Sequence, residues 1–197
     1  MSAEVLNLKC RGCGAPLTIG DTFCKYCGGP VSISTFNSVN NMPLPLVNKY
    51  ANSYKKDLQN DPNDMSANKA IAYCYLKLKL YDKALEYFEK AVMDNFDDSE
   101  VYFYAAISLL KGKKAFYQQK ETIDKAIEYT NAAIMIQPLG IYYYFLTYLK
   151  FDYYKRKFLN TNPPYTETLN MAKQVGLSEY DIDQLYKILG VDRPNGI

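Results

Sequence analysis

The stretch NKAIAYCYLKLKLYDKALEYFEKAV, residues 68–92, decides the fold, because its apolar side chains recur with the period of an α-helix. The small residues Ala72, Ala84 and Ala91 allow two helices to pack closely, and the aromatic residues Tyr75 and Phe88 fill the gaps on either side. The pattern predicts a hairpin of two helices, at 65–79 and 81–91. Pro62, directly after Asp61, is predicted to lie just inside the start of the first helix.

The same five positions resemble those of the tetratricopeptide repeat, a helical hairpin with a period of about 34 residues. Asn68 stands where that family usually has Trp, and Phe96 stands where it usually has the helix-ending Pro. One period later, Ala72 maps to Ala106. In the next hairpin, the second helix matches the pattern only if an insertion at 111–118 is allowed for. With this insertion, Ala84 corresponds to Ala126, Ala91 to Ala133 and Phe96 to Pro138.

Working outward, further helices are expected on both sides of the first hairpin. The predicted helices are 99–111, 120–137, 141–159, 165–175 and a last one from Ser178 to Gly190, with a capping helix at 46–59 before the repeats. The repeat resemblance fades beyond residue 139. The predicted fold class is mainly α, a tetratricopeptide-like α-solenoid of helical hairpins preceded by a small β module at the N-terminus.

Four of the five cysteines lie close together, as Cys10-Arg11-Gly12-Cys13 and Cys24-Lys25-Tyr26-Cys27. Two intervening residues let both thiolates of a turn face one metal, and two such turns complete a tetrahedron. Glycines after each pair can take the positive φ that curls backbone amides toward the sulfurs. Short strands are expected at 5–8, 16–19 and 31–33. Residues 8–33 resemble a zinc ribbon with rubredoxin-type knuckles.

One structural Zn²⁺ is therefore the expected cofactor, with Cys10, Cys13, Cys24 and Cys27 as its ligands. So few residues bury too little apolar surface to fold unaided, and structural zinc contributes about 10–16 kcal/mol in such peptides. Four thiolates leave no coordination position open for catalysis. Two disulfides or a redox-active pair are the alternatives, and both need a context that the sequence lacks. Cys74, in a helix, is interpreted as a small buried hydrophobe.

The predicted division is a ribbon at 1–33, a linker at 34–45 and a helical domain at 46–197. The linker region is rich in Ser, Asn and Pro, so it is interpreted as a hinge that leaves the ribbon some freedom.

Composition removes several classes of function. The net charge of +2 does not favour nucleic acid or an anionic membrane, and the absence of His excludes the usual Ser-His and Cys-His nucleophile pairs. The first residues do not read as a secretory signal, and the longest apolar stretch is too short to span a bilayer. A cytoplasmic, non-enzymatic protein is expected.

The resemblance implies that the first helix of each hairpin lines a groove for protein partners. By pattern position, the partner-binding residues would be Lys69, Tyr73, Lys77, Phe103, Ile107, Lys111, Phe145 and Leu149, with Leu76, Leu110 and Asp152 beside them. Packing against neighbouring helices is the alternative for many of these. The tyrosine-rich helix at 141–154 is either central to the fold or an interface.

A scaffold or adaptor is the leading prediction, with a protein partner docked on the helices and the ribbon as a second contact module. A homo-oligomer or a larger complex stays open. The alternative is a nucleic-acid-associated factor that uses Lys9, Arg11, Lys25 and Tyr26 for phosphate and stacking contacts. An enzyme ranks third, since no glycine-rich phosphate loop or nucleophile elbow occurs.

Overall fold

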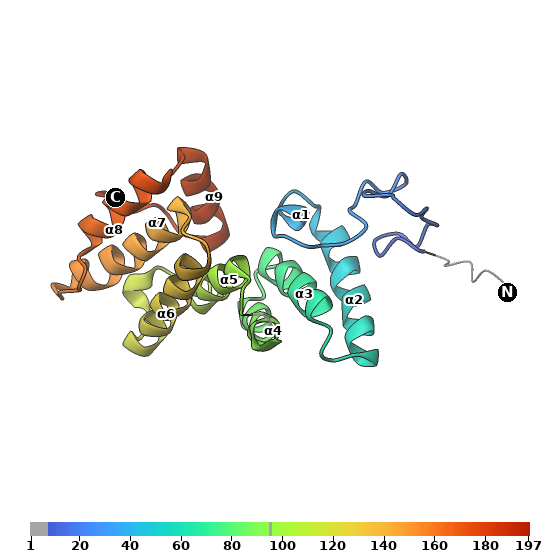
Figure 1. Cartoon of the computed structure of the whole chain (residues 1–197), viewed down its shortest axis with the longest axis horizontal. Coiled ribbons are helices and arrows are strands. Elements are labelled where there is room, and N and C mark those ends of the chain that lie inside the picture. The colour runs from blue at the N-terminus through green and yellow to red at the C-terminus, as the bar shows by residue number, and fades with distance from the viewer. Residues whose placement is uncertain (1–7, 95) are drawn as a thin grey trace.

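The structure is a computed structural model that describes residues 8–94 and 96–197. Helices dominate these residues, and they follow one another as antiparallel neighbours from one end of the molecule to the other (Figure 1). The α-helices are α1 Asn37–Asn40, α2 Leu44–Asn60, α3 Met65–Lys77, α4 Tyr81–Asp94, α5 Ser99–Leu109, α6 Lys120–Ile136, α7 Gly140–Leu149, α8 Tyr165–Val175 and α9 Glu179–Leu189. The predicted helices from 65 onward are confirmed to within about two residues at most ends, apart from the end of the tyrosine-rich helix.

The helices pair as the small residues require. Ala72 of α3 and Ala84 and Ala91 of α4 are buried where the two helices approach, and the Phe88 ring lies 5.4 Å from that of Tyr73. A second hairpin, α5 with α6, repeats this arrangement. The predicted insertion between its helices is a loop that contains the 3₁₀ turn η1, Ala115–Tyr117. The fold is thus a mainly α, tetratricopeptide-like stack of hairpins, as predicted.

The first repeat helix starts at Met65 as predicted, but the predicted placement of Asp61 and Pro62 at its start is wrong. The cap of α3 is Asp64, whose Oδ1 accepts a hydrogen bond of 3.1 Å from the Ala67 amide. Asp61 and Pro62 lie in the preceding turn, and the Pro62 carbonyl accepts 3.0 Å from Asn68 Nδ2. The buried amide of Asn68, standing where the family has Trp, holds this turn against the helix.

The tyrosine-rich helix is central to the fold. Tyr142, Tyr144, Phe145 and Tyr148 are buried because α6, α8 and α9 pack around α7. The helix continues through a π-helical turn, η2 Lys150–Tyr154, and a 3₁₀ turn, η3 Lys155–Lys157, then ends at Phe158 with φ of 59°. The helix was predicted to end at residue 159, slightly later than it does. Most of its tyrosine rings are buried in the core and do not form an exposed interface.

The N-terminal module has less β structure than predicted. Within residues 8–33 the backbone pairs only at two isolated antiparallel bridges, Lys9 with Pro16 and Phe23 with Pro30. Each bridge rests on two flanking backbone hydrogen bonds, from Cys10 to Ala15 and from Leu17 to Leu8 in the first loop, and the equivalent pair in the second, and neither extends into a ladder. Residues 5–7 of the first predicted strand lie outside the described part of the chain.

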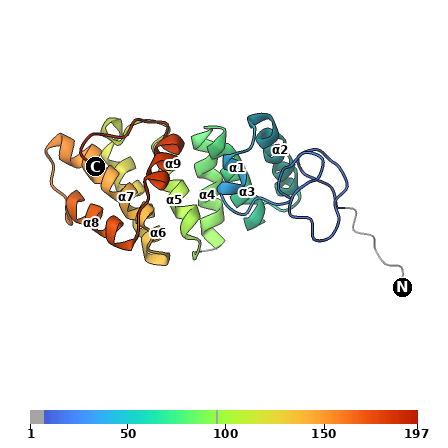
Figure 2. The same cartoon turned by 90° about the horizontal axis from the view of Figure 1, so that it is seen from above.

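The expected free hinge is also not observed. Residues 37–40 form the short helix α1, and the Phe36 and Val39 side chains are buried against the repeats. The ribbon lies directly on α2 (Figure 2), where Tyr54 Oη accepts 2.9 Å from the Ile33 amide. The composition of 34–45 is that of a loop, but the buried side chains of Phe36 and Val39 anchor it.

Candidate metal centre and helical groove

The two cysteine loops have the same backbone geometry. In the first, the Gly14 amide donates to the Cys10 carbonyl and the Cys10 amide donates to the Ala15 carbonyl, both at 2.8 Å. In the second, the amides of Gly28 and Cys24 make the equivalent bonds at the same distance. Gly14 and Gly28 take φ of 78° and 69°, the left-handed conformation that the turn requires. Each loop therefore presents two thiols on one side.

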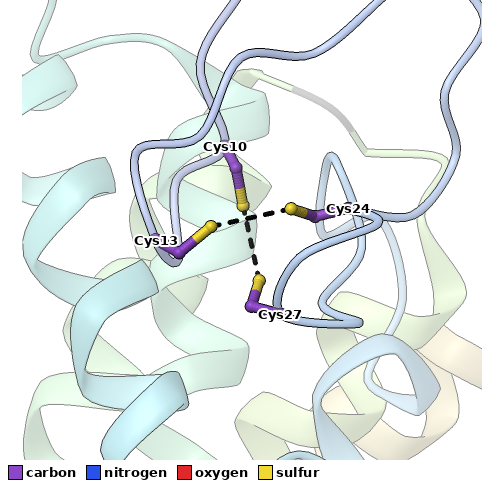
Figure 3. A group of neighbouring side chains, drawn as sticks. All are labelled: Cys10, Cys13, Cys24 and Cys27. Carbon is purple, nitrogen blue, oxygen red and sulfur yellow. Dashed lines mark hydrogen bonds between the residues drawn. The ribbon is translucent and has the colours of Figure 1, made fainter.

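The four thiols converge on one point (Figure 3). Their Sγ atoms all lie within 4.8 Å of one another, and the Cys10–Cys27 and Cys13–Cys24 pairs are 3.6 Å apart. Tetrahedral zinc with Zn–S bonds of about 2.3 Å would place the sulfurs about 3.8 Å apart. The four residues predicted as ligands are thus brought together, in a geometry that could hold a metal ion.

The acidities of these thiols differ in a way that suits a cation. Burial raises the pKa of Cys10, but the backbone amides of Cys13 and Gly12 outweigh it and hold the pKa at about 6. Burial raises the pKa of Cys27 to about 12, with the neighbouring thiols adding to the effect. Several thiolates so close together repel one another, so deprotonation of all four thiols requires a positive charge between them.

Arg11, inside the first loop, fastens this site to α2. It pairs with Asp57, donates to Ser53 Oγ at 3.4 Å, and its Cζ lies 4.4 Å from the centre of the Tyr54 ring. An added Cβ at Gly12 would lie 2.7 Å from Leu46 Cδ1 and 2.9 Å from Tyr50 Cε2, so a larger residue there would require these side chains to shift. Because Arg11 is engaged inside the protein, it is not free for the phosphate contact that the nucleic-acid alternative requires.

The second loop meets α2 through a tyrosine. The Tyr50 hydroxyl donates a hydrogen bond to the Pro30 carbonyl, and a Cβ added at Gly29 would lie 2.6 Å from that hydroxyl oxygen. Sequence reasoning missed this joint. Its signal was the pair Tyr50 and Tyr54, spaced one helical turn apart and facing the glycines of the loops.

The predicted partner surface needs correction. Five of its side chains are buried in the helix packing: Tyr73, Phe103, Ile107, Phe145 and Leu149. Phe36 covers Tyr73, with ring centres 6.1 Å apart, and α6, α8 and α9 surround the α7 residues. These side chains are core, because each first helix is packed on more than one side. Only Phe103 among the five also lines a cavity.

The three predicted lysines all have partners within the chain. Lys69 pairs with Asp98, which also caps α5, and Lys111 pairs with Asp82. Lys77 donates to the Asn40 carbonyl and so holds α1 in place. Lys111 is exposed, while Lys69 and Lys77 are half-buried.

A groove made of two cavities lies on the face that carries α1 and α9, the helices drawn above α3 and α5 in Figure 1. Asn40 Nδ2 donates 3.3 Å to Gln184 Oε1, which joins α1 to α9 across the repeats. On one side of this bridge lies a cavity of about 480 Å³, lined by the rings of Phe103, Tyr104 and Tyr142 and by the acids Glu100 and Asp181. On the other side lies one of about 300 Å³, lined by Lys77, Lys79 and Lys187.

Glu100 forms part of the wall of the larger cavity. Its Oε1 accepts 3.2 Å from the Phe36 amide, and its Oε2 accepts 2.8 Å from the Tyr73 hydroxyl. Burial raises the pKa of this carboxyl, against these hydrogen bonds and the charge of Lys69, which lower it.

Comparison with solved structures agrees with this architecture. The helical part has a tetratricopeptide-like fold. The structure named "MamA MSR-1 C2" superposes with a TM-score of 0.53 at 13% identity, covering 70% of this chain and 79% of that one. "MamA AMB-1 C2221" gives 0.53 at 13% identity, covering 68% and 79%. These identities bear on the fold alone. No family model matches the sequence, and no curated protein matches it.

In the described part of the chain, no helix combines the length and the apolar character needed to cross a bilayer.

Proposed function

We propose that this chain is a zinc-stabilised, non-enzymatic scaffold that docks a protein partner on its helical stack and uses the ribbon as a second contact module. The observation that carries the proposal is the groove on the α1–α9 face. A tetratricopeptide-like stack keeps two cavities there, lined by first helices, in the size range of ligand sites. A cytoplasmic location fits this role.

The metal in this proposal is zinc, held by Cys10, Cys13, Cys24 and Cys27. Four sulfur ligands at tetrahedral separations suit zinc, and a chain without His cannot complete a mixed site with imidazole. Four thiolates close the coordination sphere, so the ion is structural. These residues would fix the two loops in the orientation in which Arg11 meets Asp57 and Tyr54 of α2 and the second loop meets Tyr50.

A role without catalysis is supported by the chemistry of the side chains. The two acids of the cavity beside α5 are already engaged within the fold, since Glu100 accepts a hydrogen bond from the Tyr73 hydroxyl and Asp181 accepts one from Ser178 Oγ, and none of the described cysteines lines this cavity. The remaining cysteine, Cys74, is buried among apolar neighbours, and burial raises the pKa of its thiol to about 12. A thiol of that pKa is a poor nucleophile near neutral pH.

The groove also indicates the kind of partner segment it fits. Acidic side chains line one cavity, basic side chains line the other, and the Asn40–Gln184 bridge separates them. Aromatic rings form much of the floor of the acidic cavity. A segment with an apolar anchor, a basic residue on one side and an acidic residue on the other complements this surface.

Site-specific photocrosslinking tests the proposal. A photoreactive phenylalanine analogue is placed at Tyr180, which is exposed at the groove and borders both cavities. The matched control carries it at Tyr117, equally exposed on the η1 loop and outside these cavities. We expect a defined protein crosslink in the native host from position 180 and not from 117. Equal crosslinking from both positions, or none from 180, contradicts docking in the groove.

A further inference from the structure

A second cleft lies where the ribbon meets α2, away from the groove. Its volume is about 660 Å³, with one wall from the first cysteine loop and its flanks and the other from one face of α2. The α2 side contributes Lys49, Asn52, Ser53 and Lys56, which share a face because they are three, four and seven residues apart. The cleft exists only because the ribbon is fixed on the helix.

Positive charge gathers in this cleft. Lys9 from the ribbon and Lys49 and Lys56 from α2 are all exposed, and no ion pair joins any of them to an acid in the described part of the chain. The fourth cation, Arg11, is already neutralised by Asp57. Among residues 8–94 and 96–197, no carboxylate lines the cleft. Three unpaired ammonium groups from two separate elements therefore face one hollow.

Apolar and hydrogen-bonding groups accompany these charges. Leu8, Leu17 and Val31 of the ribbon line the cleft and are only partly buried. Ser32, Ser53 and Asn52 supply neutral donors and acceptors beside them. Such a mixture suits a peptide, whose backbone needs hydrogen-bond partners and whose side chains can be both apolar and charged.

From this combination we infer that the ribbon–α2 cleft binds an acidic linear peptide segment whose carboxylates pair with Lys9, Lys49 and Lys56 and whose aliphatic side chains cover Leu8 and Leu17. A single-stranded nucleic acid fits less well, because the cleft presents no aromatic ring on which a base could stack. Tyr26 and Lys25, which the nucleic-acid alternative invoked, do not line it, and Lys25 lies 3.7 Å from Asp21. The inference deepens the proposed scaffold function, because it assigns partner chemistry to the second contact module.

The test uses the full-length, zinc-loaded protein and a short fluorescein-labelled peptide of alternating glutamate and leucine. Fluorescence anisotropy measures its dissociation constant for the wild type, for Lys56→Glu and for Lys55→Glu. Lys55 is the matched control, since it is exposed on the same helix, undergoes the same change of charge and does not line the cleft. We expect Lys56→Glu to weaken binding about tenfold or more and Lys55→Glu to change it less than about twofold. Lys49→Glu should behave like Lys56→Glu.

Several outcomes would overturn the inference: no binding of the peptide, equal weakening by Lys55→Glu and Lys56→Glu, or tighter binding of single-stranded RNA than of the peptide. The zinc content of each variant, measured on the same samples, shows whether the ribbon is intact. Failure of this inference can be distinguished from failure of the proposed scaffold function, which the crosslinking experiment tests. A partner captured at Tyr180 together with charge-independent peptide binding would leave the scaffold proposal standing and remove only this cleft.

Discussion

The guanidinium of Arg11 lies over the ring of Tyr54, with Cζ 4.4 Å from its centre. Both residues belong to contacts that span the ribbon and α2, since Tyr54 also accepts a hydrogen bond from the Ile33 amide. The Arg11–Asp57 pair beside them is about one-third exposed on each side, so solvent screens its charge attraction. Arg11 therefore contributes to the joint through its contact with the Tyr54 ring as well as through the ion pair.

Replacing Arg11 by lysine should loosen the ribbon even though the charge is kept. Lysine cannot reproduce a planar group that stacks and pairs at once, so we expect the free energy of unfolding to fall by about 1 kcal/mol. Urea denaturation measures this. Lys25→Met, at an exposed position in the second loop, is the control. If Arg11→Lys is no more destabilising than this control, the contact between the Arg11 guanidinium and the Tyr54 ring does not stabilise the protein.

Purified protein should contain one zinc ion per chain. Cys24→Ser should remove it, because it deletes one of the four sulfurs, while Cys74→Ser should leave the metal content unchanged. Elemental analysis gives the content, and hydrogen exchange of residues 8–33 reports the fold of the ribbon. A metal-free protein with full protection of these amides would refute the metal site.

Thiol reactivity should separate the cysteines. In the folded, zinc-loaded protein, Cys74 should resist alkylation near neutral pH, because burial both blocks access and raises the pKa of its thiol to about 12. Chelation should expose the ribbon thiols first, and Cys74 should react only on unfolding of the helices. Mass spectrometry of the alkylated peptides gives the order. Labelling of Cys74 before the ribbon cysteines would contradict the packing of α3.

Gly140→Ala should destabilise the C-terminal end of the stack. A Cβ at this position would lie 1.9 Å from the Gly176 carbonyl oxygen and 2.9 Å from that of Ala172, so α7 and the end of α8 would have to separate. Overpacking of this kind costs about 1–3 kcal/mol. Urea denaturation measures it against Gln174→Ala, on the exposed part of α8. Equal stability of the two variants would show that the helices are not in contact there.

The stability of the protein should depend on pH through Glu100. Burial raises the pKa of this carboxyl above its ordinary value of 4.5, so the folded state holds the proton more tightly than the unfolded state. Its contribution is therefore fully present below the unfolded pKa and is lost as pH rises through the folded pKa. Glu100→Gln keeps a neutral side chain able to meet both Phe36 and Tyr73. As the pH rises from the unfolded pKa of Glu100 to its folded pKa, the wild type loses stability that the variant keeps. We therefore expect the free energy of unfolding of Glu100→Gln to increase relative to that of the wild type as the pH rises.

Thermal denaturation at a series of pH values tests the Glu100 prediction, with Glu86→Gln as an exposed acidic control on α4. A stability difference between Glu100→Gln and wild type that does not vary with pH would count against it.

Local signals made the helices and the cysteine cluster predictable from sequence. Ser178, for example, caps α9 through a hydrogen bond of 3.1 Å from the Asp181 amide, and the spacing of the four cysteines alone specifies their convergence. The partner surface was not predictable in this way. Whether Phe145 or Ile107 is exposed depends on which segments cover α7 and α5, and those segments are distant in sequence.

The placement of residues 34–45 shows the same difficulty. Its composition is that of a loop, and nothing local reveals that Phe36 meets Tyr104, with ring centres 4.7 Å apart. The cleft beside α2 was likewise invisible, because its lysines come from two elements that are joined only in the folded chain.

Through the contact between ribbon and α2, the proposed metal site would link the helical stack to the supply of metal. Stacked repeats fray from their ends, and α2 at the N-terminal end of the stack is covered by the ribbon, which is proposed to fold around an ion. Any ligand that binds only the folded form stabilises it by an amount that grows with the logarithm of its free concentration, about 1.4 kcal/mol per tenfold above the dissociation constant. If the proposed zinc holds the ribbon together, its scarcity would begin to unravel the stack from Leu44 onward, and the supply of a trace element would set how much of the proposed platform is folded.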